Sequence, residues 1–155
     1  MSISPIALYL DSGPRPRARS RSATRSKPLP APRVKVLIVD DEDDIREVAQ
    51  LSLEMMAGWQ VIGVDSGERA LVDAARERPD VVLLDVMMPG MDGPTTARRL
   101  RAQAETGDIP VILLTAKVRS SDEMQFAGLD VAGVISKPFD PISLADQITS
   151  ILRGR

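Results

Sequence analysis

The stretch that decides the fold is a run of aliphatic residues ending in an acid and a turn: Val81-Val82-Leu83-Leu84-Asp85-Val86-Met87-Met88-Pro89-Gly90-Met91-Asp92-Gly93. Successive large aliphatic residues require burial on both faces, which is typical of a central strand in a parallel sheet. Asp85 is therefore predicted at the carboxyl end of a strand, where open α/β sheets bind their ligands. Taken alone, this acid is more readily interpreted as a helix cap or a solvated loop residue.

Other aliphatic runs divide the rest of the chain in the same way. They predict strands at 34–39, 59–64, 109–114 and 131–136. Segments with helical apolar spacing or helix-start signals lie between and after them, at 44–57, 66–78, 94–105, 120–128 and 140–152. This alternation predicts five βα units with right-handed crossovers. The expected fold is a doubly wound α/β fold with a five-stranded parallel sheet, the flavodoxin-like architecture.

Capping signals predict where several helices begin. Asp44 with Glu47 is expected to cap the first helix, and Asp140 the last one. Asp92 is expected to shape a turn with the glycine that follows it. Apolar spacing predicts the inward faces of the first and last helices, which are Ile45, Val48, Ala49, Leu53 and Met56, and Ile142, Ala145, Ile148 and Leu152.

Composition divides the 155 residues into a basic tail and an acidic domain. Residues 1–32 are rich in Pro, Arg and Ser and carry six basic side chains against Asp11 alone, so we expect a disordered tail there and one domain at 33–155. The sequence has no cysteine and no apolar run long enough to span a bilayer. These features predict a cytoplasmic protein without membrane insertion.

The basic tail has several possible interpretations. Arginine-rich segments can bind nucleic acid or an acidic membrane surface, but the tail lacks interleaved aromatic residues, so a solvated linker is favoured. Its composition also fits a transit peptide. Binding of nucleic acid is therefore not the expected role.

Polar residues follow four of the predicted strands, and the parallel topology must bring them to one end of the sheet. They are Asp40, Asp41, Asp85, Thr115 and Lys137. Carboxylates crowded together stay ionised only if a cation shares the site. An oxygen-only ligand set, without His or Cys, points to Mg²⁺. Beside a metal ion and a lysine, the Asp85 carboxylate could attack a phosphoryl group.

Four motifs in this order resemble the receiver domain of two-component response regulators, over about residues 33 to 154. They are Asp40-Asp41, the stretch from Asp85 to Gly93, Thr115-Ala116 and Lys137-Pro138-Phe139. The resemblance implies that Asp85 accepts a phosphoryl group from a histidine kinase or a histidine phosphotransfer protein.

The same resemblance implies a role for each neighbour of Asp85. Asp41 would bind Mg²⁺ directly, Asp40 would bind it through water, and the backbone carbonyl of Met87 would supply another ligand. Lys137 would pair with Asp85 and then with its phosphate, while the Thr115 hydroxyl would hydrogen-bond a phosphoryl oxygen. It also implies a cis peptide bond between Lys137 and Pro138.

Two positions depart from the family pattern or modify it. Val134 stands where most receivers carry Tyr or Phe, so we expect the usual aromatic readout to be absent. Lys117 lies two residues after the threonine, at a position that influences phosphate lifetime in this family. We expect Lys117 to alter hydrolysis by steering or blocking the attacking water.

The chain ends soon after the last predicted helix, so we expect a single-domain receiver that acts through protein contacts, either as a phosphorelay intermediate or as a regulator that docks on a target protein. The main alternative is a Mg²⁺-dependent phosphohydrolase with an aspartyl nucleophile. Such enzymes usually need a second Asp two residues after the nucleophile, and this residue is Met87. A further alternative is an adaptor that binds nucleic acid through its basic tail.

Overall fold

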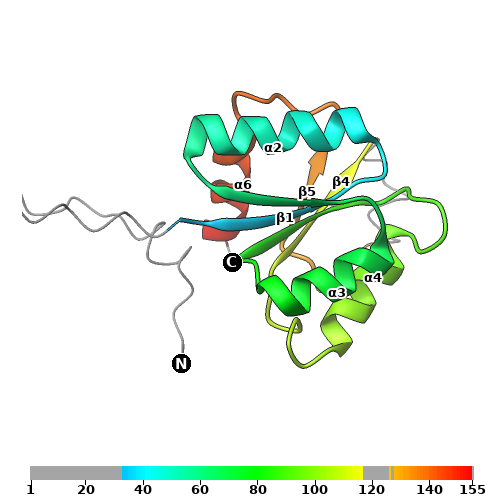
Figure 1. Cartoon of the computed structure of the whole chain (residues 1–155). Helices are drawn as coiled ribbons and strands as arrows, with labels where there is room; N and C mark the ends of the chain where they lie inside the picture. Colours follow the sequence, from blue (N-terminus) through cyan, green and yellow to red (C-terminus); the bar gives the residue numbers. More distant parts are fainter. Residues whose placement is uncertain (1–32, 117–125, 127, 155) are drawn as a thin grey trace, which may run out of the picture.

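Five short strands pair in parallel in the order β2-β1-β3-β4-β5 (Figure 1). The computed structural model describes residues 33–116, 126 and 128–154, and the strands within them are β1 (Lys35–Val39), β2 (Gln60–Val64), β3 (Val81–Asp85), β4 (Val111–Thr115) and β5 (Gly133–Ser136). Every neighbouring pair of strands is parallel. The predicted doubly wound, flavodoxin-like fold is therefore confirmed.

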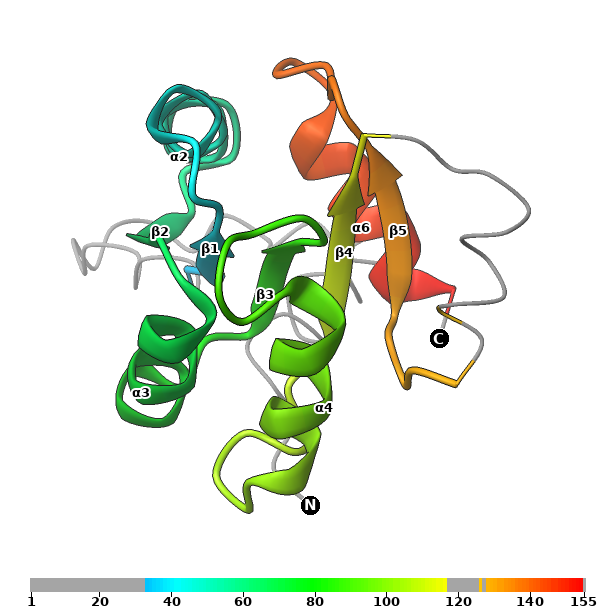
Figure 2. The same cartoon turned by 90° about the vertical axis from the view of Figure 1, so that its right-hand side faces the viewer.

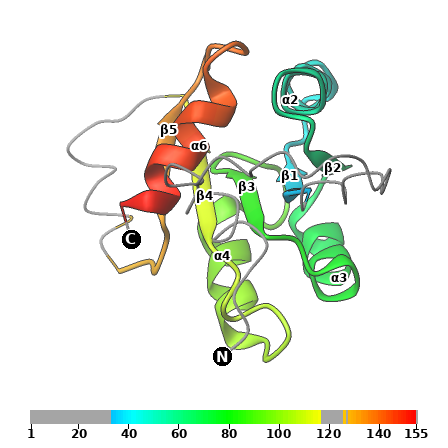
Figure 3. The same ribbon diagram turned by 90° about the vertical axis from the view of Figure 1, so that its left-hand side faces the viewer.

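Helices cover both faces of the sheet (Figure 2, Figure 3). Helices α2 (Asp43–Ala57) and α6 (Leu144–Arg153) pack on one face, and α3 (Gly67–Glu77) and α4 (Gly93–Ala102) pack on the other. None of these described helices has the length and apolar character needed to cross a membrane. The predicted tail at 1–32, and most of the helix predicted at 120–128, lie outside the described residues.

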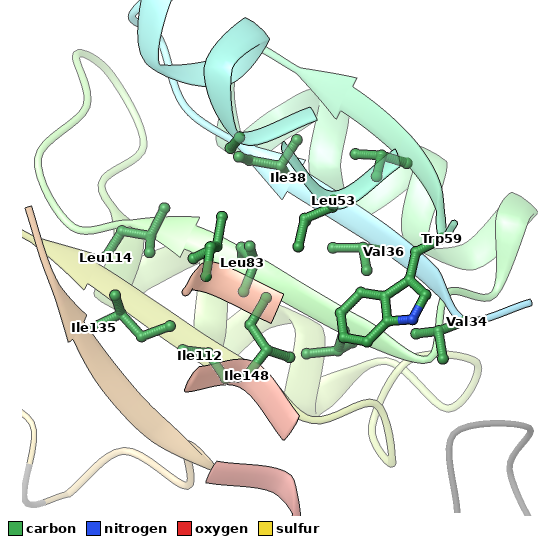
Figure 4. Close-up of a cluster of buried hydrophobic side chains, with 14 residues drawn as sticks. Val34, Val36, Ile38, Leu53, Trp59, Leu83, Ile112, Leu114, Ile135 and Ile148 are labelled. Carbon is green, nitrogen blue, oxygen red and sulfur yellow. The ribbon is translucent and has the colours of Figure 1, made fainter. Parts of the chain in front are cut away.

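The core consists of two apolar layers, one on each face of the sheet. Leu83 of β3 packs with Leu53 of α2 and Ile148 of α6 (Figure 4). Leu84, the next residue of β3, belongs to the opposite cluster with Leu100 of α4. Since successive strand residues point to opposite faces, both layers demand aliphatic side chains. This explains the uninterrupted aliphatic runs in the sequence.

Helix α2 begins differently from the prediction. Glu42 is its N-cap and its side chain makes no capping hydrogen bond, so the predicted capping pair of Asp44 and Glu47 is wrong. Asp43 and Asp44 instead lie in the first turn, where negative charge is favourable because of the helix dipole. Gly58 ends the helix with a φ of 67°, as its position predicts.

The buried face of α2 includes a polar residue that the apolar spacing does not reveal. Ala49 and Leu53 are buried as predicted, whereas Val48 and Met56, also predicted to face inward, are 44% and 59% exposed. Ser52 is buried beside them, and its hydroxyl donates to the backbone carbonyl of Pro141. This hydrogen bond holds the turn before α6 against α2.

Helix α6 begins later than predicted. Its N-cap is Ser143, because Asp140 caps a preceding turn instead, in which the Ile142 N–H donates to Asp140 Oδ1 at 3.0 Å. Ile142 is therefore outside the helix and 71% exposed, contrary to its predicted inward position. Leu144 and Ile148 form the buried face.

Side-chain caps begin the two helices on the other face. The Ser66 hydroxyl, at the predicted start of α3, accepts a hydrogen bond from the Arg69 N–H at 3.2 Å. Asp92 does more than shape a turn, since it is the N-cap of α4 and accepts from the Thr95 N–H at 2.8 Å. The start of α4 is thereby fixed directly after the loop that follows Asp85.

Candidate functional site

The carboxyl ends of the strands bring the predicted site residues together. Asp40 follows β1, Asp85 is the last residue of β3, Thr115 is the last residue of β4, and Lys137 follows β5. These four strands are consecutive neighbours in the sheet, and Thr115 pairs with Ser136 in the register. All four functional candidates therefore lie along one end of the sheet.

The three aspartates predicted to bind metal form a compact cluster. Asp40, Asp41 and Asp85 each place a carboxylate oxygen within 4.8 Å of the others. Asp40 is fully buried and Asp85 is 4% exposed, whereas Asp41 is exposed. The cluster is thus closed on the protein side and open to solvent beside Asp41.

Lys137 joins the two buried acids. Its Nζ lies 2.6 Å from Asp40 Oδ2 and 3.2 Å from Asp85 Oδ1. The resemblance implied pairing with Asp85 alone, but the shorter contact is to Asp40. The Lys137 N–H also donates to the carbonyl of Thr115 at 2.7 Å, and the peptide bond to Pro138 is cis as predicted. The ammonium is therefore shared between β1 and β3.

The Asp40 carboxylate is fixed by the backbone around it. Its Oδ1 accepts a hydrogen bond from the Glu42 N–H at 2.9 Å, while its Oδ2 accepts from Lys137. The Asp40 N–H donates to the Val64 carbonyl at 3.1 Å, and Arg46 donates to the Asp40 carbonyl at 2.7 Å. This acid is held in place from both its main chain and its side chain.

Crowding makes the ionised form of Asp85 costly. Burial first, and the nearby charge of Asp40 second, raise the pKa of the Asp85 carboxyl to about 6, against the opposing effects of Lys137 and of the Met87 N–H. The Met87 N–H lies 3.3 Å from Asp85 Oδ1. A cation placed among the acids would favour the ionised carboxylate.

The same surroundings favour the charged form of Lys137. Burial disfavours its charge, but hydrogen bonding to Asp40 and the charges of Asp40 and Asp85 outweigh burial and raise the pKa of Lys137. The group therefore stays an ammonium at neutral pH. One ammonium among three carboxylates leaves the cluster with excess negative charge.

The donor set fits a hard divalent cation. All three acids of the cluster offer oxygen ligands, and the whole sequence contains no His or Cys that would favour zinc. Mg²⁺ takes a few carboxylates and completes its shell with water, which the exposed side of Asp41 allows. The residues present therefore fit the Mg²⁺ expected from the sequence.

The loop after Asp85 is closed by a close backbone approach. The Gly93 N–H donates to the Val86 carbonyl at 3.0 Å. A Cβ at Gly93 would lie 2.3 Å from the carbonyl oxygen of Asp85, so no other residue fits without displacing the backbone. Sequence reasoning treated Gly93 as a turn residue and missed this contact.

Comparison with known proteins identifies the family. The family model of the response regulator receiver domain matches residues 36–149. The chain belongs to this family. The match runs from the second residue of β1 through β5 and includes every residue of the acidic cluster and Lys137.

The curated relatives of this chain include transcriptional regulators that are about twice as long as the matched region. The phosphate regulon transcriptional regulatory protein PhoB of Pseudomonas aeruginosa is 39% identical over 117 residues, which are 76% of this chain and 51% of PhoB. The chain thus spans about half the length of the curated relatives it matches.

Solved structures show the same receiver fold. Chemotaxis protein CheY4 of Vibrio cholerae superposes with a TM-score of 0.72 at 30% identity, covering 77% of this chain and 98% of CheY4. The signal receiver domain of a signal transduction histidine kinase from Syntrophus aciditrophicus has a TM-score of 0.69 at 33% identity, covering 78% and 91% of the two chains.

Other receiver residues named from the sequence are placed less completely. Thr115 is 6% exposed at the end of β4, and the Met87 side chain is 77% exposed above the loop. Val134 stands on β5 and packs against the apolar layer on the α3 and α4 face. Lys117 lies outside the described residues. The roles predicted for the Thr115 hydroxyl, the Met87 carbonyl and Lys117 stay predictions.

Proposed function

We propose that Asp85 accepts a phosphoryl group, in a Mg²⁺-dependent reaction, from a histidine kinase or a histidine phosphotransfer protein. The observation that carries this proposal is the cluster in which Asp40 and Asp85 share Lys137 while Asp41 opens it to solvent. Membership of the receiver family supports a regulatory phosphoacceptor over a phosphohydrolase that turns over a substrate.

Each neighbour has a distinct part in the proposed transfer. A carboxylate oxygen of Asp85 attacks phosphorus as the bond to the donor histidine nitrogen breaks, and the donor keeps the electron pair. Asp41 would hold Mg²⁺ directly, with Asp40 through water and the Met87 carbonyl as a further ligand. Bound Mg²⁺ would neutralise negative charge on the phosphoryl oxygens.

Lys137 and Thr115 would stabilise the phosphorylated form. The Lys137 ammonium already contacts Asp85 Oδ1 and is near the oxygens that a phosphoryl group would add. If the Lys137 ammonium moved from Asp85 to the phosphoryl group, it would still have a buried partner, because Asp40 stays bonded to it. The Thr115 hydroxyl would donate to a phosphoryl oxygen.

We further propose that residues 33–155 form the receiver and act in the cytoplasm through protein contacts within a phosphorelay. Curated relatives are transcriptional regulators about twice as long as the matched region, so output through DNA is the competing outcome. Mixing the phosphorylated chain with histidine phosphotransfer domains and measuring back-transfer tests the relay. Retention of phosphate by the chain in every mixture would contradict it.

The phosphoacceptor is tested by intact mass after incubation with acetyl phosphate and Mg²⁺. The wild-type chain is expected to gain one phosphoryl group, and Asp85→Asn is expected to gain none. Asp92→Asn is the matched control, because Asp92 lies in the same loop and caps α4 instead of facing the cluster. Equal labelling of Asp85→Asn, or full labelling in the presence of a chelator, would refute the proposal.

A further inference from the structure

Exposed apolar side chains gather in one groove of the described surface. Five of the exposed large hydrophobic residues line a hollow between α2 and the turn before α6, together with Pro141: Val48, Leu51, Met55, Met56 and Ile142. Val72 and Met87 are the exposed large hydrophobics elsewhere. We call this hollow the α2 groove. A gathered apolar patch on a soluble domain usually marks a contact surface.

The α2 groove leads toward the acidic cluster. Val48 also lines a second apolar hollow, whose other walls include Ile45, Phe139 and the stem of Lys137. Lys137 in turn contacts Asp40 and Asp85. A segment lying in the groove would therefore reach the edge of the candidate phosphoacceptor site.

The chain itself supplies a segment next to the groove. The Val34 carbonyl accepts a hydrogen bond from the Gln60 N–H at 2.9 Å, shortly after Gly58 ends α2. The last turn of α2, which carries Met55 and Met56, lies at the same end of the sheet as the start of β1 (Figure 1). Residues 1–32 thus join the described chain beside one end of the groove.

The tail has an apolar end and enough chain to reach the groove. Its large apolar side chains are concentrated in residues 3–10, Ile-Ser-Pro-Ile-Ala-Leu-Tyr-Leu. A flexible coil as long as residues 11–32 has a root-mean-square length of about 26 Å, and the prolines and like charges of this segment favour a longer reach. That distance is comparable to the length of about 22 Å for a helix with the 15 residues of α2.

Charge complements this arrangement. Residues 41–57 contain six acids, five of them at or before Glu47, against Arg46 alone. Arg46 is already paired with Asp43. The tail between Asp11 and Arg33 carries the six basic residues noted above. An arginine-rich spacer would therefore be attracted along the acidic surface of α2.

We propose that residues 3–10 dock in the α2 groove, with the basic spacer lying along the acidic side of α2. A short tether gives an effective concentration on the order of 1 mM, so a segment with a dissociation constant near 0.1 mM would be docked most of the time. This docking does not depend on phosphorylation of Asp85.

A spin label in the full chain tests the docking directly. The sequence has no cysteine, so Ser4→Cys provides one labelling site. With methyl-labelled methionine, we expect the label to broaden the Met55 and Met56 signals strongly and the signal of Met88 weakly, because Met88 packs on the other face. Raising the salt concentration should weaken but not abolish the effect.

Matched variants assign the effect to the groove. Leu51 on α2 and Val72 on α3 are 56% and 57% exposed, so replacing either by Gln leaves the core intact. Leu51→Gln is expected to weaken docking about tenfold or more and to reduce the broadening, whereas Val72→Gln is expected to preserve it. Leu8→Gln in the tail should act like Leu51→Gln.

Two results would overturn the proposal. One is a spin-labelled Ser4→Cys chain in which the Met55 and Met56 signals are not broadened, or in which Leu51→Gln leaves their broadening unchanged. The other is broadening that appears only between spin-labelled and isotope-labelled molecules mixed together, which would assign the groove to a second copy of the chain.

Discussion

At the amino ends of the strands, Lys35 pairs with Asp80 and Glu77, whereas at the carboxyl ends Asp40 and Asp85 share Lys137 beside the exposed Asp41. The backbone N–H of Lys35 donates to Asp80 Oδ2 at 2.9 Å, and the Lys35 Nζ lies 3.3 Å from Glu77 Oε2. The carboxyl end instead concentrates three acids around one ammonium, two of them buried.

The two ends of the same sheet therefore respond differently to ions. At the amino end the ion pair between Lys35 and Glu77 is partly exposed, so it contributes modestly to stability. Excess negative charge at the carboxyl end lowers stability until a cation or a proton relieves it. Such a cost in stability is typical of a site selected for ligand binding. It can be measured by comparing the unfolding free energies of variants at the two ends of the sheet.

The largest difference is expected for the two lysines. Lys137→Met leaves Asp40 and Asp85 buried without their shared ammonium and should cost about 3 kcal/mol of unfolding free energy in a chelator. Lys35→Met, the control at the amino end, should cost about 0.5 kcal/mol, because its ion pair is partly exposed. Urea denaturation measures both, and equal losses would show that the ends do not differ.

Removing an acid from the crowded end should stabilise the protein. The folded pKa of Asp85, about 6, lies above the ordinary value of 3.8 for this side chain, so the stability that its protonated form contributes is lost as pH rises through that interval. Without Mg²⁺, Asp85→Asn should be more stable than wild type by about 2 kcal/mol near pH 7.5, with the gain shrinking toward pH 5. A gain that is independent of pH would contradict the crowding argument.

Magnesium should act on one end alone. At a tenfold excess over its dissociation constant, Mg²⁺ should stabilise the wild-type chain by about 1.4 kcal/mol, because it binds the folded cluster. Asp41→Asn should lose most of this gain, while Asp80→Asn at the amino end should keep it. Thermal unfolding with and without Mg²⁺ distinguishes the two variants.

The smallest effect is expected for Asp92, whose carboxylate is hydrogen-bonded at the start of α4. Hydrogen bonding to Thr95, through its side chain first and its N–H second, lowers the pKa of Asp92. Its contribution should therefore be present at neutral pH and lost as pH falls, the reverse of Asp85. Asp92→Ala should cost about 1 kcal/mol at neutral pH and less in acid. Asp108→Ala, in an exposed turn, is the control.

Much of this site could be predicted because each strand end is marked in the sequence. Aliphatic residues give way to a polar residue at Asp40, Asp85 and Thr115, where each strand reaches the carboxyl edge of the sheet. The amino ends were less well defined, since β5 begins at Gly133 and not at Val131. Parallel topology then fixed which strand ends meet.

Contacts between distant segments could not be predicted. The hydroxyl of Ser52 bonds to the carbonyl of Pro141, and this contact depends on how α2 and α6 pack. Likewise, the sequence places Lys137 near two acids, but the length of its side chain and the fixed position of Asp40 decide that the closer contact is to Asp40. Such choices depend on three-dimensional packing and not on local pattern.

Gly93 links chemistry at Asp85 to the outer surface of the molecule. No side chain separates residue 93 from the Asp85 carbonyl, and the Val86 hydrogen bond closes the intervening loop. A shift of the main chain at residue 85 would consequently displace the first turn of α4 directly, without side chains between them that could absorb it by changing rotamer. The proposed phosphoryl group on Asp85 would thus act on α4 through direct backbone contact at its first residue.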